Sequence, residues 1–209
     1  MARYLKARCK LCRREGMKLF LKGVRCVTEK CPFVKRPQPP GMHTRTSSKP
    51  SYYALQLREK QKVKRMYGAL EKQFKRFFRS ASKSKGVTGR MLLQLLERRL
   101  DNVIYRSLFA LSRSQARQFV RHGFVFINGR RANIPSYIVK EGQTIDLRAK
   151  DTTKKVIKEN IEINSKERSV VSWLEVDNAN LKARIVRVPE KEDISIPVNE
   201  QFIVELYSK

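Results

Sequence analysis

Apolar side chains recur every three to four residues over two stretches of the chain, and this spacing predicts two amphipathic helices. The first helix is expected from Tyr52 to about Ser80, and the second from Arg90 to about Phe109. Gly68 lies inside the first stretch. Because glycine costs a helix about 1 kcal/mol relative to alanine, this position is a candidate for a bend or a break.

A third, shorter helix is predicted from about Ser112 to His122. Ser112 is a good N-cap, and Gln115 follows three residues later, as a capping box requires. Gly123 can end the helix in the left-handed conformation. The helix therefore has its own start and stop signals.

A β-hairpin is expected after this helix. Residues 124–127 are apolar and are followed by Asn128 and Gly129, the strongest short signal of a hairpin. Alternate residues of the strand face the core, which leaves Phe124 and Phe126 on its other face. We expect these two rings to pack against a neighbouring domain or RNA, because exposed aromatic side chains need a partner.

The remaining pattern is weaker. It predicts short strands at residues 134–139 and 143–147, a helix from Thr152 to about Ile163, a short apolar turn at 171–177, a strand at 181–188 and a final helix at 200–207.

Charge changes this picture, because the 209-residue chain has a net charge of +28. The net charge is +12 over residues 1–50, +10 over 51–90, +7 over 91–150 and −1 over 151–209. Self-repulsion of this size calls for a polyanionic partner, and nucleic acid is the expected one. The near-neutral last segment is expected to pack on protein instead.

A membrane surface is the alternative partner for so basic a chain. No apolar run approaches the roughly 18 residues of a membrane span, and no lipidation signal is present. The N-terminus has basic residues but lacks the apolar core of a signal peptide. We therefore expect the protein in a reducing cytosol and away from membranes.

All four cysteines lie within the first 31 residues, as Cys9, Cys12, Cys26 and Cys31. Two ligands separated by two residues can bind one ion from a tight turn, and a second pair across a loop completes a tetrahedral site. The spacing predicts a structural site of four thiolates holding Zn²⁺. A 4Fe-4S cluster uses the same ligands and is the second interpretation. The third interpretation is that the cysteines are free or disulfide-bonded.

Basic residues favour phosphate binding in two places. Arg113, Arg117 and Arg121 recur every fourth residue, so they form one row on the third helix. Arg130 and Arg131 directly follow the hairpin turn. Together with a helix N-terminus, they predict a compact surface for phosphates.

Residues 111–131 also resemble the RNA-binding module named after the bacterial small-subunit ribosomal protein S-four. The resemblance continues at residues 1–4, 13–16, 56–65, 96–106, 173–176 and 204–209, so it covers nearly the whole chain. The chain departs from the family at Phe124 and Phe126, where small or polar residues are usual, and at Leu108, where glycine or a similar small residue is usual.

The pattern and the resemblance together predict an α+β fold. Its parts are a metal-clasped basic N-terminal arm with a helical domain, and a small module of helices packed on a mainly antiparallel sheet. The expected segments are the four-cysteine arm and proline-rich linker at 1–50, an RNA-facing helical domain at 51–90, the S-four-type module at 91–165, and the near-neutral segment at 166–209.

The resemblance implies a structural constituent of the cytoplasmic small ribosomal subunit. The family binds the 5′ domain of 16S ribosomal RNA early, which nucleates assembly. It touches ribosomal protein S-five, an interface tied to decoding accuracy, and lies at the mRNA entrance, while some members repress their own mRNA. No homo-oligomer is expected. The predicted RNA contacts are Arg3, Arg13, Arg14, Lys22, Arg36, Arg45, Lys49, Arg58, Lys64, Arg65, Lys72, Arg76, Arg106, Arg113, Arg117, Arg121, Asn128, Arg130 and Arg131.

Two other functions fit the same module. An RNA-modifying enzyme would need a catalytic domain, but the chain has no Gly-rich phosphate loop and only two histidines, and little length remains beyond the module. A free regulator of mRNA or transcription would use the same basic surface. We therefore expect a structural RNA-binding protein with no catalytic residues.

Overall fold

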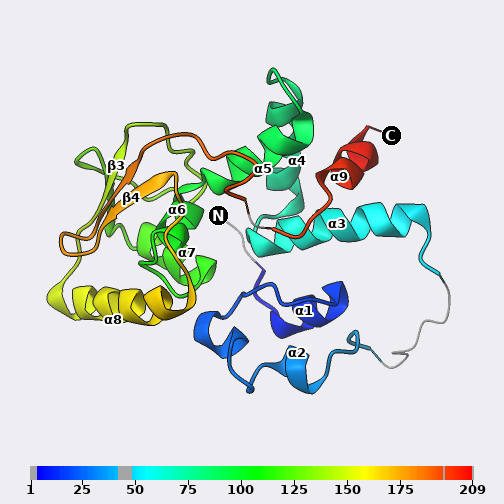
Figure 1. The fold of residues 1–209 in the computed structure, drawn as a ribbon, viewed down its shortest axis with the longest axis horizontal. Coiled ribbons are helices and arrows are strands. Elements are labelled where there is room, and N and C mark those ends of the chain that lie inside the picture. The colour runs from blue at the N-terminus through cyan, green and yellow to red at the C-terminus, as the bar shows by residue number, and fades with distance from the viewer. Residues whose placement is uncertain (1–3, 42–48, 195, 209) are drawn as a thin grey trace. The chain divides into compact units, whose positions relative to one another are not determined.

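The computed structural model of the chain describes residues 4–41, 49–194 and 196–208 (Figure 1). The chain divides into two compact units, one formed by Met1–Leu92 with Ile196–Lys209 and the other by Leu93–Ser195. Helices and one antiparallel sheet give the predicted α+β fold. In the described part of the chain, no helix combines the length and apolar character that a membrane crossing requires.

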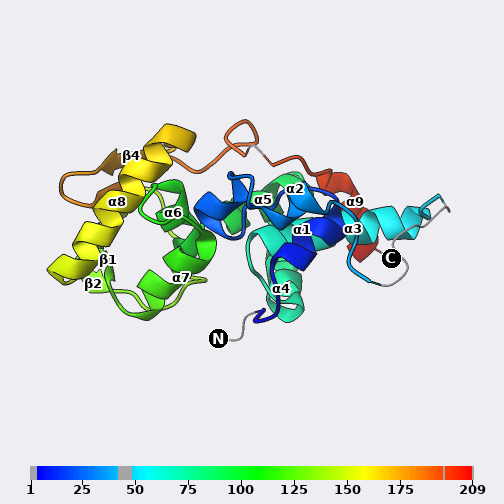
Figure 2. The same ribbon diagram turned by 90° about the horizontal axis from the view of Figure 1, so that it is seen from below.

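The first unit is helical. Its elements are α1 (Cys9–Glu15), the 3-10 helix η1 (Gly23–Cys26), α2 (Pro32–Lys35), α3 (Tyr52–Met66), α4 (Glu71–Ser82), the first part of α5 (Thr88–Glu97) and α9 (Glu200–Tyr207). Figure 2 shows α1 and α2 next to each other. Gly68 adopts φ +61° between α3 and α4, so the predicted helix from residue 52 does break there.

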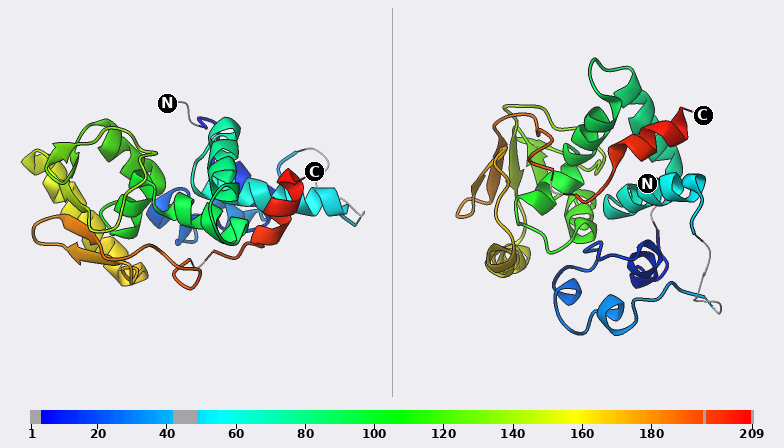
Figure 3. Two further views of the ribbon diagram at one scale, coloured as in Figure 1. Left: turned by 90° about the horizontal axis from the view of Figure 1, so that it is seen from above. Right: turned by 45° about the vertical axis from the view of Figure 1, so that its right-hand side comes forward.

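Helix α9 packs on α3, although some 130 residues separate them in the chain (Figures 1 and 3). Tyr52 meets Phe202 edge to face, with ring centroids 5.7 Å apart. Phe78 of α4 stacks on Tyr207 at 4.5 Å. Ile203 is completely buried. The near-neutral composition of this last segment is thus accommodated by packing within the chain itself.

The second unit contains the sheet. Its elements are α6 (Leu100–Arg106), α7 (Arg113–Arg121), β1 (Val125–Ile127), β2 (Arg130–Arg131), β3 (Thr144–Leu147), α8 (Asp151–Glu167), β4 (Leu174–Asp177) and β5 (Lys182–Ile185). The strand order is β2-β1-β3-β5-β4, and every pair is antiparallel. One core joins the sheet to α6, α7 and α8 around the fully buried Trp173.

The predicted α7 and hairpin are confirmed, although the Gln115 side chain accepts the Leu111 N–H at 2.8 Å and not the Ser112 N–H of a capping box. The Ser112 hydroxyl accepts the Gln115 N–H at 3.3 Å and caps α7. Asn128 and Gly129 form the turn with φ of +48° and +80°, as a tight hairpin requires. Register pairs Ile127 with Arg130 across β1 and β2.

The two phenylalanines of β1 find partners inside their own unit. The ring centroid of Phe124 lies 6.4 Å from that of Phe119 and 5.7 Å from that of His122. The guanidinium of Arg148 lies over Phe126, 4.8 Å from the ring centroid. Packing on a second domain or RNA is therefore not required to cover either ring.

The predicted helix from Arg90 to Phe109 is instead two helices, α5 and α6. Arg99 between them has extended backbone (ψ +136°) and bridges to Ile138. Its buried side chain pairs with Asp101 at 2.7 Å. The predicted strand at 134–139 is wrong, because within the described residues this segment forms a single isolated bridge, between Ile138 and Arg99.

Strand β4 also differs from the prediction. The predicted turn at 171–177 is partly strand β4, because Leu174–Asp177 pairs with β5.

Leu108 has φ +66°, a conformation that favours glycine. Asn160 and Asn164 of α8 donate to the carbonyls of Phe109 and Leu108, at 3.1 and 2.6 Å, and so hold this strained connection.

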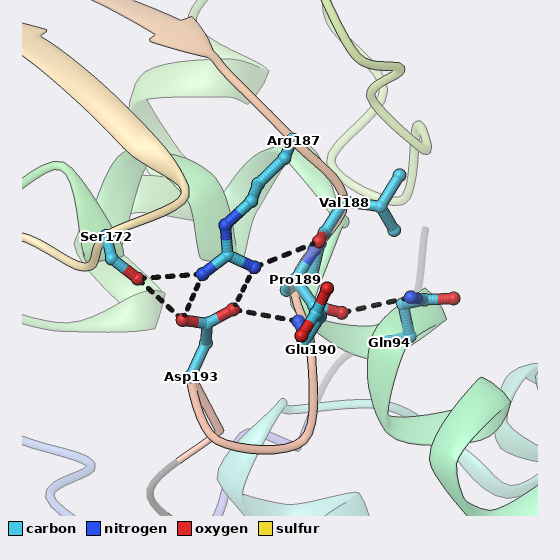
Figure 4. A network of polar contacts seen from close by, with 7 residues as sticks. All are labelled: Gln94, Ser172, Arg187, Val188, Pro189, Glu190 and Asp193. Atoms are coloured by element: carbon cyan, nitrogen blue, oxygen red, sulfur yellow. Dashed lines mark hydrogen bonds and ion pairs between the residues drawn. The ribbon is translucent and has the colours of Figure 1, made fainter.

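A polar network fixes the chain where it leaves the sheet (Figure 4). Arg187 donates two hydrogen bonds to Asp193, at 2.7 and 2.8 Å, and a third to Ser172 at 3.1 Å. Gln94 donates to the Pro189 carbonyl at 2.9 Å. Burial raises the pKa of Asp193, but hydrogen bonds, first from Arg187, outweigh it and hold that pKa below its usual value.

Candidate nucleic-acid interface

Helix α4 separates its apolar and basic residues onto opposite faces. Phe74, Phe78 and Ala81 are buried. The four cations of the other face are spaced at three and four residues and are all exposed: Lys72, Lys75, Arg76 and Arg79. Because an ordinary solvated face mixes charges of both signs, this face is the clearest candidate for contact with phosphates. We call it the α4 basic face.

Sequence reasoning placed only two of these cations, Lys72 and Arg76, among the expected contacts. Lys75 and Arg79 belong to the same basic side of the helix predicted from residue 52, and the structure shows them exposed beside the other two. The helical spacing that predicted the apolar stripe places all four cations on the opposite side.

Lys64 lies beside this face but is engaged within the protein. Lys60 and Lys64 each donate to Glu71 at 2.8 Å, and the Tyr207 hydroxyl donates to it at 2.9 Å. Burial raises the pKa of Glu71, but these hydrogen bonds prevail and lower it to about 2. Glu71 therefore stays ionised and joins α3, α4 and α9.

Several predicted contacts of the arm also make bonds within the chain. Arg58 and Arg65 of α3 both pair with the buried carboxylate of Glu15 in α1. Burial raises the pKa of Glu15 despite these two cations. Arg13 and Arg14 donate to the carbonyls of Gln38 and Pro40, at 2.8 and 3.2 Å. These arginines thus order the arm. Lys22, Arg36 and Lys49 are exposed, and Arg3 and Arg45 lie outside the described residues.

The row of arginines on α7 does not face one way. Arg113 donates to Asn102 at 2.7 Å and lies over Tyr105, 4.5 Å from the ring centroid. Arg117 is 9% exposed and contacts Asp101 at 3.4 Å. Burial lowers the pKa of Arg117, although Asp101 opposes the shift.

Of this row, only Arg121 is exposed. Arg113 and Arg117 both contact residues of α6, so in the described structure these two side chains hold α7 against α6. Arg106 of α6 also forms a paired contact with Glu97, with hydrogen bonds of 2.7 and 3.0 Å.

At the hairpin, the three predicted contacts have different surroundings. The Asn128 side chain accepts the Thr144 N–H at 2.9 Å. Arg131 donates to the carbonyls of Gly123 and His122, at 3.1 and 3.2 Å. Arg130 is exposed, and its guanidinium makes no hydrogen bond or ion pair with the other described residues. Arg121 and Arg130 are therefore the predicted residues of this region best placed for phosphates.

The predicted metal clasp is not formed in this structure. Cys12, Cys26 and Cys31 are buried, Cys9 is half-buried, and all four are free thiols. Over residues 4–41, 49–194 and 196–208, no group of three or more Cys, His, Asp or Glu side chains is arranged to hold a metal ion. This arrangement does not support a zinc site. The spacing in the sequence keeps the two cysteines of each pair close along the chain, but it does not determine whether the two pairs meet around one ion.

The thiols nevertheless influence one another. Burial raises the pKa of Cys12, and the other three cysteines raise it further. Burial also raises the pKa of Cys26, which accepts the Lys22 N–H at 3.3 Å. Such a hydrogen bond favours the thiolate, the form that binds metals.

Comparison with known proteins agrees with these features. Residues 3–97 match the family described as Ribosomal protein S4/S9 N-terminal domain, and residues 98–145 match the S4 domain. The chain is similar over its full length, and that of each relative, to proteins named small ribosomal subunit protein uS4. Identity is 57% for that of Oleidesulfovibrio alaskensis, 56% for that of Dictyoglomus turgidum and 54% for that of Thermodesulfovibrio yellowstonii.

Proposed function

This chain belongs to the family of small ribosomal subunit protein uS4, and from that premise we infer that it is a structural, RNA-binding constituent of the small subunit of the cytoplasmic ribosome and not an enzyme. We propose further that it is a primary binder of the 5′ domain of 16S ribosomal RNA, and that this binding nucleates assembly. The observation that carries this proposal is the α4 basic face, with four exposed cations and no acid among them.

The physical mechanism is release of counterions from RNA. Lysine and arginine side chains neutralise phosphates, and the displaced counterions make binding fall steeply as salt rises. The charge layout supports this, since the first 150 residues carry the whole net positive charge. Reading shape and phosphates suits recognition of a junction of RNA helices.

The test is binding of the full-length chain to a 5′-domain fragment of 16S ribosomal RNA over a series of salt concentrations. We expect replacement of Lys72, Lys75, Arg76 and Arg79 by Gln to weaken binding and to reduce the salt slope by about one unit per lost phosphate contact. The melting temperature should not fall, because all four side chains are exposed.

The matched control replaces four exposed lysines of α8 by Gln: Lys154, Lys155, Lys158 and Lys166. This helix mixes both signs, so we expect a smaller effect on the salt slope. Equal effects of the two sets would show that only net charge matters and would remove the α4 basic face from the proposal.

Contacts with another protein and with mRNA form a second part of the proposed function. We propose that the chain also touches ribosomal protein S-five, contributes to decoding accuracy and lies near the mRNA entrance. Lys49 is exposed and could contact mRNA, while Arg45 is outside the described residues. Crosslinking within reconstituted small subunits tests both contacts, and absence of any crosslink from the chain to S-five would overturn the first.

Autoregulation would use the same surface. A protein that binds the 5′ domain through the α4 basic face could bind its own mRNA there, and the two RNAs would then compete. Competition between the 5′-domain fragment and the leader of the protein's own mRNA tests this. Simultaneous binding of both RNAs would contradict it.

We propose, finally, that the four cysteines take up one metal ion once they approach each other more closely than in this structure. The support is the donor set itself, four free thiols near the start of the chain, together with the backbone hydrogen bond onto Cys26. Zn²⁺ fits four thiolates and would order the basic arm. A 4Fe-4S cluster uses the same donors.

A further inference from the structure

A pocket of about 590 Å³ lies beside the β1–β2 hairpin, within the second unit. Figure 2 shows the two strands of this hairpin at the end of that unit. The pocket is lined on the hairpin side by Ile127, Asn128, Arg130 and Arg131, and on the other side by Asn133, Ile134, Tyr137 and Gln143. None of the residues on its second side was among the predicted RNA contacts.

The second side of the pocket is preformed although it belongs to no helix or strand. The carbonyls of Pro135 and Tyr137 accept the N–H groups of Asp101 and Leu100, at 3.1 and 2.8 Å. The Tyr137 N–H donates to the Ile134 carbonyl at 3.1 Å. These bonds fix the loop to the start of α6, so a ligand would meet it without having to order it first.

The aromatic ring in this wall is held in one orientation. Gln143 donates to the Tyr137 hydroxyl at 3.1 Å and accepts the Lys140 N–H at 2.8 Å. Both ends of the Gln143 amide are therefore in use. Tyr137 packs partly against the core and also lines the pocket, which is how a protein offers a ring for stacking.

Polar groups with spare capacity surround the ring. Asn133 is exposed, and its amide makes no hydrogen bond to any other described residue. It can offer two donors and one acceptor. Arg130 is likewise exposed and unengaged in the described structure. The exposed Ile134, at 55%, adds an apolar surface.

An aromatic ring, an unengaged amide and a cation together match the parts of one nucleotide. Single-stranded RNA is read by stacking of splayed bases on aromatic rings and by hydrogen bonds to their edges, while arginine binds the phosphate. We propose that this pocket receives one unstacked nucleotide of the bound RNA, with its base on Tyr137 and Asn133 and its phosphate on Arg130. This inference rests on the proposed RNA-binding function.

The experiment is chemical probing of the 5′-domain fragment of 16S ribosomal RNA, using reagents that modify the Watson–Crick edge of unpaired bases. The fragment is probed alone and with saturating protein, so that occupancy is equal for all variants. We expect wild type to protect one unpaired base that Asn133→Ala leaves reactive. The dissociation constant should rise roughly fivefold, the value of one neutral hydrogen bond.

Further variants separate the roles. Tyr137→Leu should also expose the base and weaken binding roughly tenfold through lost stacking, whereas Tyr137→Phe keeps the ring and should retain protection. Arg130→Ala should reduce the salt slope by about one unit, and Asn133→Ala should leave it unchanged. Asn180→Ala, an exposed asparagine outside the pocket, is the control for Asn133.

The two proposals fail differently. If wild type does not bind the fragment, the proposed function fails. If wild type binds but Asn133→Ala and Tyr137→Leu give the same footprint and affinity as wild type, RNA binding stands and the nucleotide pocket is overturned.

Discussion

The guanidinium of Arg131 occupies the space beside Gly123 that a side chain would fill. A Cβ added at Gly123 would lie 2.0 Å from the Arg131 Nη2, and Nε of Arg131 donates to the Gly123 carbonyl at 3.1 Å. Gly123 also has φ +74°. The absence of a side chain at Gly123 therefore leaves room for the guanidinium of Arg131, and this contact ties the hairpin to the helix before it.

Gly123→Ala should destabilise the protein more than Gly129→Ala. Both glycines have positive φ, +74° and +80°, so each alanine incurs a similar backbone strain of roughly 1–2 kcal/mol. Nothing lies within 4 Å of a Cβ at Gly129. At Gly123 the alanine also displaces Arg131, whose hydrogen bonds contribute about 1 kcal/mol more. Urea denaturation of both variants measures the difference, and equal losses would show that Arg131 adds nothing.

Arg117→Ala should reduce stability, while Arg121→Ala should reduce RNA affinity without unfolding the protein. Removing Arg117 leaves Asp101, which is 3% exposed, with Arg99 as its remaining ion-pair partner in the described structure. We expect a loss of about 2 kcal/mol, below the usual cost of breaking a buried pair because Arg99 remains. Arg121 is exposed, so its loss should instead lower the salt slope by about one unit.

Thermal melts and RNA titrations distinguish the two variants. A destabilised Arg121→Ala, or a fully stable Arg117→Ala with reduced RNA affinity, would reverse the assignment. Arg113→Ala should behave like Arg117→Ala, because Arg113 contacts both Asn102 and Tyr105.

Glu71 should make stability depend on pH in the acid range. Its pKa falls from 4.5 to about 2 on folding. A depressed carboxylate pKa contributes stability that is fully present above the unfolded value and is lost as pH falls through the folded value. Stability should therefore decline between about pH 5 and pH 2.

The size of this effect is limited, because the Glu71 side chain is 47% exposed and solvent screens its two lysines. We expect no more than about 1 kcal/mol. Glu71→Gln should reduce the pH dependence of the unfolding free energy by this amount, relative to wild type. An unchanged pH profile would mean that Lys60, Lys64 and Tyr207 do not stabilise the ionised form.

Metal content tests the proposal for the four cysteines. We expect about one zinc per chain in protein purified without oxygen, by the preference of four thiolates. Chelation should free four thiols to a thiol reagent and weaken binding to the 5′-domain fragment, because the arm loses its order. Iron with sulfide would identify a cluster, and four reactive thiols with no metal before chelation would refute the site.

Elements with complete local signals were predictable. Helix α7 has Ser112 to start it and Gly123 to end it, and the hairpin has Asn128 and Gly129 in its turn. The break at Gly68 was foreseen because glycine is costly in any helix. These signals act over a few residues, so the amino-acid sequence contains them whatever the rest of the chain does.

Features that depend on distant partners were not predictable. The break between α5 and α6 needs Ile138 to bridge Arg99, and strand β4 exists only because β5 pairs with it. Likewise, spacing gave the row of arginines on α7 but not its surroundings. Arg113 and Arg117 face α6 because Asn102 and Asp101 lie there.

The position of α9 sets a constraint on how the protein is made. Residues 200–207 complete the helical unit that begins with the first residues of the chain, and the whole second unit is synthesised between them. Domains that are continuous in the chain can fold as they emerge during translation. Here the packing of the N-terminal unit is complete only after α9 has been synthesised, because Tyr207 stacks on Phe78. A chain interrupted before residue 200 would lack α9, so α4 would be without the Tyr207 ring that packs on Phe78, beneath the α4 basic face.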